Sequence, residues 1–167
     1  MRLRPRDGSF LAQRSRGVGG KAARLALETS LHFDVVLDLR RRVLVIDDQP
    51  CFRAFLQRIL EVDGYRVEVA DDGDSALSAL ANAPDPCVIL VDLLMPRLNG
   101  ITFISRLRDR FGLGRFPVIV ISALFSADDV DPPDFPGVRG IIGKPFEPRV
   151  VRAAVRHAWA ALEQQAA

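Results

Sequence analysis

The sequence predicts an α/β fold in which helices cover both faces of a five-stranded parallel sheet. Two observations support this prediction. Strand-like and helix-like segments alternate from Arg42 onward, and the segments Val43–Asp47 and Cys87–Asp92 are continuous apolar runs that end in an acid. Continuous apolar runs are typical of strands buried on both faces. Regular alternation of such strands with helices is typical of a parallel sheet built from strand–helix–strand units.

The first helix is expected to begin near Pro50, because proline suits the first helical turn, and to end at Gly64. One face of this helix is apolar, formed by Phe52, Phe55, Leu56, Ile59 and Leu60. The later strands are expected at 66–70, 87–92, 117–121 and 140–143, and the later helices at 72–83, 100–111 and 148–164.

Charge divides the chain into two parts. Residues 1–42 hold ten basic and four acidic side chains, whereas residues 43–167 hold 13 basic and 17 acidic ones. We therefore expect a basic N-terminal extension over residues 1–41, partly disordered, and a mildly acidic domain over residues 42–165. Three interpretations of the extension stay open: binding to nucleic acid, binding to anionic lipid, and an assigned start codon that lies upstream of the true one.

Composition excludes several classes of protein. No apolar run is long enough to span a bilayer, and no apolar segment of a secretory signal follows the first arginines. The two cysteines, Cys51 and Cys87, lack the spacing of metal ligands. We expect both thiols to be reduced and buried, which indicates a cytoplasmic protein.

Chemically active side chains stand at the carboxyl ends of the predicted strands. They are Asp47 and Asp48 after the first strand, Asp92 after the third, Ser122 after the fourth and Lys144 after the fifth. The carboxyl ends of parallel strands share one edge of the sheet, which is where such folds bind ligands. We therefore expect these five side chains to converge.

Phosphoryl transfer to a carboxylate needs this set of groups. Asp92 is a competent nucleophile toward a phosphoryl donor if the charge of the donor is cancelled. Mg²⁺, or Mn²⁺ in its place, would do so, with direct oxygens from Asp48, Asp92 and the Leu94 carbonyl and a water-mediated contact to Asp47. The Ser122 hydroxyl and the Lys144 ammonium would hold the remaining phosphoryl oxygens. The chain has 21 arginines but only two lysines, so a lysine at this position is informative.

The sequence resembles the receiver domains of two-component signalling from about Arg42 to Gln164. The resemblance is carried, in order, by Asp47-Asp48, by Asp92-Leu93-Leu94-Met95-Pro96 with Asn99-Gly100, by Ser122-Ala123, and by Lys144-Pro145-Phe146. It implies a flavodoxin-like sheet of order 2-1-3-4-5 and a cis peptide bond before Pro145. It also implies that Asp92 accepts a phosphoryl group from a sensor histidine kinase or a histidine phosphotransfer protein.

The resemblance further implies a signalling module and not an enzyme. The only reactions that it would catalyse are its own phosphorylation and dephosphorylation. The chain ends just after the last predicted helix, so no DNA-binding output domain is expected. Such a stand-alone response regulator would act by contact with an unidentified downstream protein or by passing the phosphoryl group on. The contact face in the family is formed by the helix after the fourth strand, the fifth strand and the last helix.

Three features depart from the family pattern. Ile141 replaces the aromatic switch residue three positions before Lys144, so a different element must report activation. Three prolines between residues 124 and 139 predict that the helix after the fourth strand is short or broken, with one turn at most near Ser126–Val130. That segment is either a tolerated loop or a remodelled partner surface. Apolar Leu94 and Leu124 flank the site and should slow hydrolysis of the acyl phosphate to hours.

Two rival functions remain. The first is an adaptor with the receiver fold that is never phosphorylated, and failure to bind Mg²⁺ would favour it. The second is an aspartate-based phosphatase. That class usually has a second acid two residues after the nucleophile, where this chain has Leu94. Turnover of a generic phosphomonoester would distinguish this class, and we expect none.

Overall fold

The computed structural model describes residues 41–83, 85–96, 98–125 and 136–166. They form one five-stranded sheet in the order β2-β1-β3-β4-β5, and every neighbouring pair of strands is parallel. The strands are β1 (Arg42–Ile46), β2 (Arg66–Ala70), β3 (Cys87–Asp92), β4 (Val118–Ser122) and β5 (Val138–Gly143). The helices are α2 (Pro50–Val62), α3 (Gly73–Asn82), α4 (Gly100–Phe111) and α5 (Pro148–Ala166). The predicted flavodoxin-like architecture and its strand order are confirmed.

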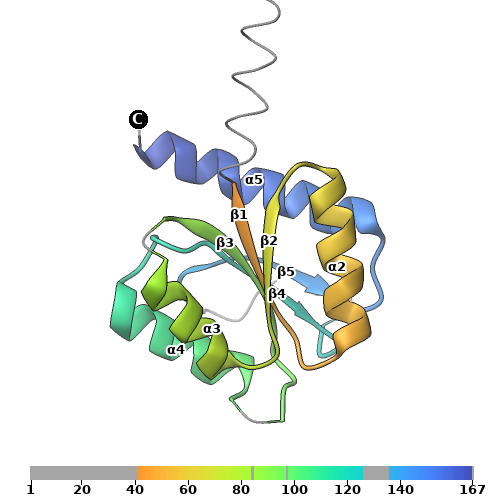
Figure 1. Cartoon of the computed structure of the whole chain (residues 1–167), viewed down its shortest axis with the longest axis horizontal. Coiled ribbons are helices and arrows are strands. Elements are labelled where there is room, and N and C mark those ends of the chain that lie inside the picture. The colour runs from red at the N-terminus through yellow and green to blue at the C-terminus, as the bar shows by residue number, and fades with distance from the viewer. Residues whose placement is uncertain (1–40, 84, 97, 126–135, 167) are drawn as a thin grey trace, which may run out of the picture. The chain divides into compact units, whose positions relative to one another are not determined.

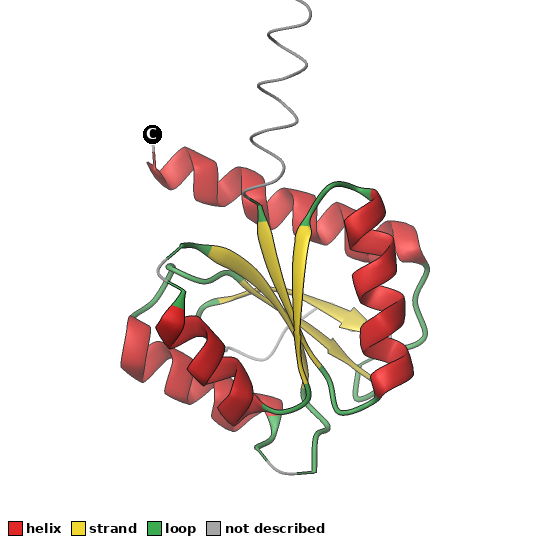
Figure 2. Ribbon diagram, in the orientation of Figure 1, coloured by secondary structure: helices red, strands yellow, loops and turns green. Residues whose placement is uncertain are grey.

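Helices cover both faces of the sheet, with α2 and α5 on one side and α3 and α4 on the other (Figures 1 and 2). Alternate residues of the central strands point into two separate cores, as the pleat of a strand requires. Ile89 and Val91 of β3 pack with α3 and α4, whereas Val88 and Leu90 pack with α2 and α5. All four of these side chains are fully buried. Burial on both faces explains the continuous apolar sequence of β3.

Local sequence signals fix the helix starts. Pro50 occupies the first turn of α2, Asp72 caps α3 by accepting a hydrogen bond from the Ser75 amide, and Asn99 caps α4 in the same way through Thr102. Gly64, with φ of 88°, follows the end of α2, where a left-handed residue is favoured. The strand before each of these helices therefore ends at the same edge of the sheet.

Several predictions of detail were wrong. β5 begins at Val138, two residues before the predicted start, because pairing with β4 extends it. Ser122 is the last residue of β4 and does not follow it. Phe55 is 40% exposed, since Leu56 and Leu60 take the sheet-facing positions of α2. Cys51 is also exposed, so only one of the two thiols is buried.

Two predictions fall largely outside the described residues. These are the partly disordered basic extension over residues 1–41 and the single turn near Ser126–Val130. Between β4 and β5 the described residues, 123–125 and 136–137, include no helical residue. Across the described part of the chain, no helix combines the length and apolar character that crossing a bilayer requires.

The two cysteines are expected to differ sharply in reactivity. Burial raises the pKa of the Cys87 thiol to about 12, whereas the Cys51 thiol is exposed on α2. Because the thiolate is the reactive form, iodoacetamide at about pH 8 should alkylate the native protein once and the denatured protein twice, counted by intact mass. Native Cys51→Ser protein should take up no label, and labelling of native Cys87 would contradict the packing of β3.

Candidate functional site: an acidic cluster bridged by a lysine

Three carboxylates gather at the carboxyl edge of the sheet. Asp47 and Asp48 follow β1, and Asp92 ends β3, the next strand in the sheet. One oxygen from each residue can be chosen so that all three lie within 4.8 Å of one another. Asp47 and Asp92 are 2% and 4% exposed, and Asp48 is half-buried. Three anions at such separations, two of them buried, need compensating positive charge.

Lys144 supplies part of that charge. Its Nζ donates hydrogen bonds to Oδ2 of Asp92 at 2.6 Å and to Oδ2 of Asp47 at 2.9 Å. Its backbone amide donates to the Ser122 carbonyl at 2.9 Å, which ties the end of β5 to the end of β4. The peptide bond between Lys144 and Pro145 is cis, as the resemblance implied. The ammonium group therefore lies between the two most buried carboxylates.

The pKa values of these groups reflect burial and mutual attraction. Burial raises the pKa of the Asp47 carboxyl above its usual value and outweighs the hydrogen bonds from Gln49 and Lys144, which act in the opposite direction. Burial lowers the pKa of Lys144, but its hydrogen bonds to Asp92 and Asp47 raise it by more, so that the net shift is upward. Lys144 is therefore a permanent cation at neutral pH.

Backbone amides fix the orientation of both buried carboxylates. The amide of Gln49 donates to Oδ1 of Asp47 at 2.8 Å, and the amide of Leu94 donates to Oδ1 of Asp92 at 3.0 Å. Each carboxylate thus has one oxygen bound to the backbone and the other bound to Lys144. These contacts pre-organise the cluster, because neither side chain can turn without losing a charge-assisted hydrogen bond.

Ser122 lies at the end of β4 and is fully buried. Its hydroxyl accepts a hydrogen bond from the Leu124 amide at 3.3 Å. Because β4 pairs with β3 in parallel, Ser122 lies at the same edge of the sheet as Asp92. All five polar residues singled out from the sequence therefore lie at one edge, as expected.

Two residues at this edge were not predicted, and both lie in the first turn of α2. The Phe52 ring lies beneath the Lys144 ammonium, with Nζ 4.0 Å from the ring centroid, and Phe146 packs edge-on against Phe52. Arg53 donates from Nη1 to the Asp47 carbonyl at 2.6 Å. A cation above an aromatic face is stabilised by the ring quadrupole. Phe52 and Arg53 thus position Lys144 and the end of β1.

Gly100 lets α4 start directly against the loop that carries Asp92. A Cβ at this position would clash with the Asp92 carbonyl oxygen and would lie 2.8 Å from the Leu93 Cα. Real Cβ atoms do not approach backbone that closely, so only glycine fits without displacing the loop. Gly100 therefore contributes to the position of Asp92.

The three carboxylates fit a divalent metal ion. Oδ1 of Asp48 is buried and has no hydrogen-bond partner among the described residues, although buried oxygens normally have one. Carboxylate oxygens are also the ligands that Mg²⁺ prefers. Asp48, Asp92 and Asp47 would therefore hold such an ion, together with the Leu94 carbonyl proposed from the sequence. When bound, it would cancel negative charge between Asp92 and an incoming phosphoryl group.

The parallel α/β sheet, with an acidic cluster and a lysine at its carboxyl edge, agrees with the receiver domain that the sequence resembles. Residues 43–156 match the family model of the response regulator receiver domain, and the chain belongs to this family. Related proteins include DNA-binding response regulator MtrA of Mycolicibacterium smegmatis, 33% identical over 71% of this chain and 50% of the relative. Another is the phosphate regulon transcriptional regulatory protein PhoB of Escherichia coli, 32% identical over 71% of this chain and 51% of PhoB.

Solved structures agree with this family membership. The receiver domain of the Francisella response regulator 1452 is 31% identical, with a TM-score of 0.63, and the match covers 72% of this chain and 98% of that domain. Chemotaxis protein CheY4 of Vibrio cholerae is 27% identical, with a TM-score of 0.60, and the match covers 71% of this chain and 98% of CheY4. This chain spans about half the length, or less, of the first curated relatives that it matches.

Proposed function

We propose that the protein is a response regulator that accepts a phosphoryl group on Asp92 in a Mg²⁺-dependent reaction. The observation that carries this proposal is the bridge from Lys144 to Asp92 at 2.6 Å, beside two further carboxylates. One oxygen of Asp92 would form the new bond to phosphorus while the bond to the donor histidine breaks and the imidazole leaves. Lys144 and Ser122 would then hold phosphoryl oxygens.

The donor would be a sensor histidine kinase or a histidine phosphotransfer protein. Family membership supports this proposal, and one partial match is the sensor histidine kinase TmoS of Ectopseudomonas mendocina, 38% identical over 49% of this chain and 8% of TmoS. Output would come through contact with a downstream protein or onward transfer, from a receiver domain over residues 42–165. The location would be cytoplasmic, where free thiols such as those of Cys51 and Cys87 stay reduced.

Metal dependence is tested by intact mass after incubation of the whole chain with acetyl phosphate. We expect a gain of one phosphoryl group with Mg²⁺ and no gain when a chelator replaces the metal. A gain that is independent of metal would contradict the role assigned to the acidic cluster. No gain in either case, together with no Mg²⁺ binding in a titration, would favour the phosphorylation-independent adaptor. Steady turnover of a phosphomonoester would favour the phosphatase.

The acyl phosphate is expected to be long-lived. Leu94 and Leu124 are 52% and 58% exposed beside Asp92 and Ser122, and offer no polar side chain to orient an attacking water. We expect loss of the label over hours in the wild type, and Leu94→Asn should shorten the lifetime about tenfold. Leu113→Asn, at a similarly exposed leucine (62%), is the matched control and should change nothing. Loss of the wild-type label within a minute would refute the prediction.

A further inference from the structure

An arginine-rich pocket lies apart from the acidic cluster, between the end of α2 and one face of α5. The pocket has a volume of about 490 Å³ and is lined by Arg41, Asp63, Tyr65, Arg149, Arg152 and Arg156. The lining thus holds four arginines and one acid. A cavity of this size is within the usual range for small-molecule sites. The charge of its lining favours an anionic ligand.

Three of the arginines form a row on α5. Positions 149, 152 and 156 are three and four residues apart, so their side chains share one face of the helix. With a rise of about 1.5 Å per residue, the row extends for roughly 10 Å. A single phosphate would meet only part of this row, whereas a chain of two or three phosphate groups could contact all of it.

Neighbouring groups hold two of the arginines in place. Arg152 donates from Nη2 to the Ile59 carbonyl at 3.4 Å, and its Nε lies 3.3 Å from the Asp63 carboxylate. Arg41 pairs with Glu163 at 2.9 Å. A guanidinium has five N–H donors, so a side chain that uses one or two of them in such contacts can still donate to a ligand. The anchored arginines lower the entropy cost of binding.

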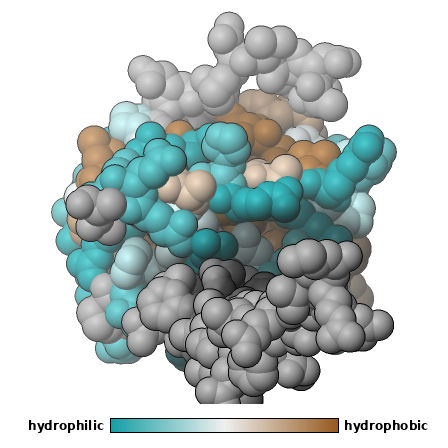
Figure 3. All heavy atoms as spheres, turned by 90° about the horizontal axis from the view of Figure 1, so that it is seen from above, coloured by the Kyte–Doolittle hydropathy of each residue, from teal (hydrophilic) through white to brown (hydrophobic). Residues whose placement is uncertain are grey.

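The other two arginines are exposed at the mouth of the pocket. Arg149 is 79% exposed in its side chain, and among the described residues it pairs with Glu147 on the surface, at 2.6 Å. Arg156 is exposed and makes no ion pair or hydrogen bond with any described residue. Surface ion pairs such as Arg149–Glu147 are weak and exchange readily for a ligand. Figure 3, a space-filling view from above the view of Figure 1, shows hydrophilic side chains in teal beside hydrophobic ones in brown.

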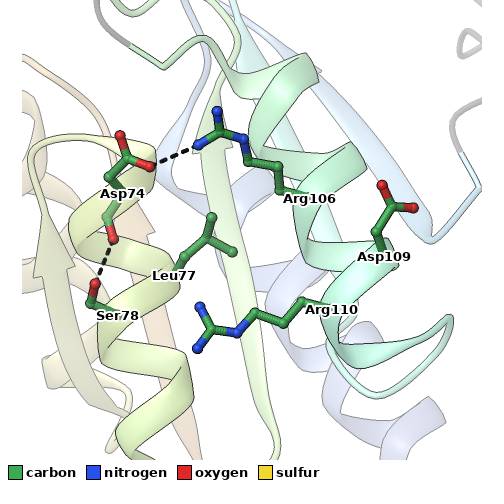
Figure 4. Close-up of a pocket in the computed structure, with 6 residues that line it drawn as sticks. All are labelled: Asp74, Leu77, Ser78, Arg106, Asp109 and Arg110. Carbon is green, nitrogen blue, oxygen red and sulfur yellow. Dashed lines mark hydrogen bonds and ion pairs between the residues drawn. The ribbon is translucent and has the colours of Figure 1, made fainter.

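A second groove shows that the charge of this pocket is distinctive. The groove between α3 and α4 has a similar volume, about 500 Å³, but its lining holds two arginines, Arg106 and Arg110, and two acids, Asp74 and Asp109 (Figure 4). Arg106 is paired with Asp74 at 2.9 Å. The lining of that groove has no net charge and predicts no anionic ligand.

We propose that the pocket between α2 and α5 binds a small polyanion with two or three linked phosphate groups. The free end of a nucleoside polyphosphate and inorganic polyphosphate share this chemistry. Guanidinium groups suit phosphate because their planar forks donate paired hydrogen bonds to its oxygens. The proposal is independent of phosphorylation at Asp92.

Calorimetric titration of the whole chain with inorganic tripolyphosphate tests the proposal. We expect saturable binding of one ligand per chain, weaker binding of orthophosphate, and a change in fluorescence of Trp159, the single tryptophan, three residues after Arg156 on α5. Arg149→Gln and Arg156→Gln should each weaken binding about tenfold. Both side chains are exposed, so the variants should keep the wild-type circular dichroism spectrum. A parallel titration with adenosine triphosphate distinguishes a nucleotide from polyphosphate alone as the preferred ligand.

Three control variants test whether binding is specific to this pocket. Arg139→Gln removes the same charge from an exposed position on β5, and Arg14→Gln with Arg16→Gln removes charge from the basic N-terminal sequence. Neither should change the affinity, and Asp92→Asn should also bind normally. Absence of saturable binding, or equal weakening by Arg139→Gln and Arg156→Gln, would overturn the proposal. Weakening only by the N-terminal pair would place the site outside this pocket and overturn it as well.

Discussion

Lys144→Met should lower the free energy of unfolding by about 2–3 kcal/mol at neutral pH in the absence of metal, because it leaves two buried carboxylates without their cation. In the wild type the ammonium bridges Asp47 and Asp92 at 2.9 and 2.6 Å. Methionine fills a similar volume, so the lost charge and not a cavity should account for the effect. Urea denaturation followed by circular dichroism measures the difference.

Two additional measurements connect this loss of stability to electrostatics. Lowering the pH toward about 4 should narrow the gap between variant and wild type, because burial raises the pKa of Asp47 and protonation of this carboxyl removes part of the repulsion that Lys144 relieves. Mg²⁺ should stabilise the variant more than the wild type, since it replaces the missing charge. Arg139→Met, at an exposed position on β5, the strand that leads to Lys144, is the matched control. Equal stability of Lys144→Met and wild type would contradict the account of the site.

Phe103→Ala should be the most destabilising single change in the core on the α3 and α4 side of the sheet. The Phe103 side chain has 0% solvent exposure on α4 and belongs to the buried cluster of that side. Truncation of a buried phenylalanine to alanine costs about 3–5 kcal/mol through lost burial and the cavity that remains. The midpoint of urea unfolding should shift accordingly, with an unchanged slope.

Ile101 on the same helix provides the control for Phe103→Ala. It is 46% exposed, so Ile101→Ala should cost about 1 kcal/mol or less. The two variants share a helix and a substitution to alanine and differ mainly in burial. Equal losses of stability would mean that α4 does not pack as described.

Much of the fold could be predicted because local and tertiary signals agree in this chain. The bounds of β2, β3 and α4 match the prediction. β3 is an apolar run that ends at an acid, and α4 starts after a capping asparagine. Where tertiary pairing decided the outcome, prediction failed: Val138 joins β5 only through its pairing with Val118 of β4.

The polar residues of the site could be predicted for a topological reason. Parallel strands bring their carboxyl ends to one edge, so the residues at those ends meet although they lie far apart in sequence. Phe52 and Arg53 could not be found in this way, since they belong to a helix. Their contacts with Lys144 and Asp47 depend on how α2 packs beside the sheet. The periodicity of α2 indicated only that Phe52 lies on the apolar face.

The arginine-rich pocket was also invisible in the sequence. Its lining combines residues from the start of the domain, the end of α2 and α5, and Arg41 and Arg156 lie more than a hundred positions apart. Arginine is so common in this chain that no single one stands out. Only the folded arrangement shows four guanidinium groups around one cavity.

The central claim is that Asp92 is the phosphoacceptor, and intact mass after treatment with acetyl phosphate and Mg²⁺ tests it most directly. Wild type, Asp92→Asn and Asp109→Asn are compared, the last being an exposed acid of α4 outside the cluster. The account predicts a gain of one phosphoryl group in wild type and Asp109→Asn, and none in Asp92→Asn. An equal gain in Asp92→Asn would contradict it.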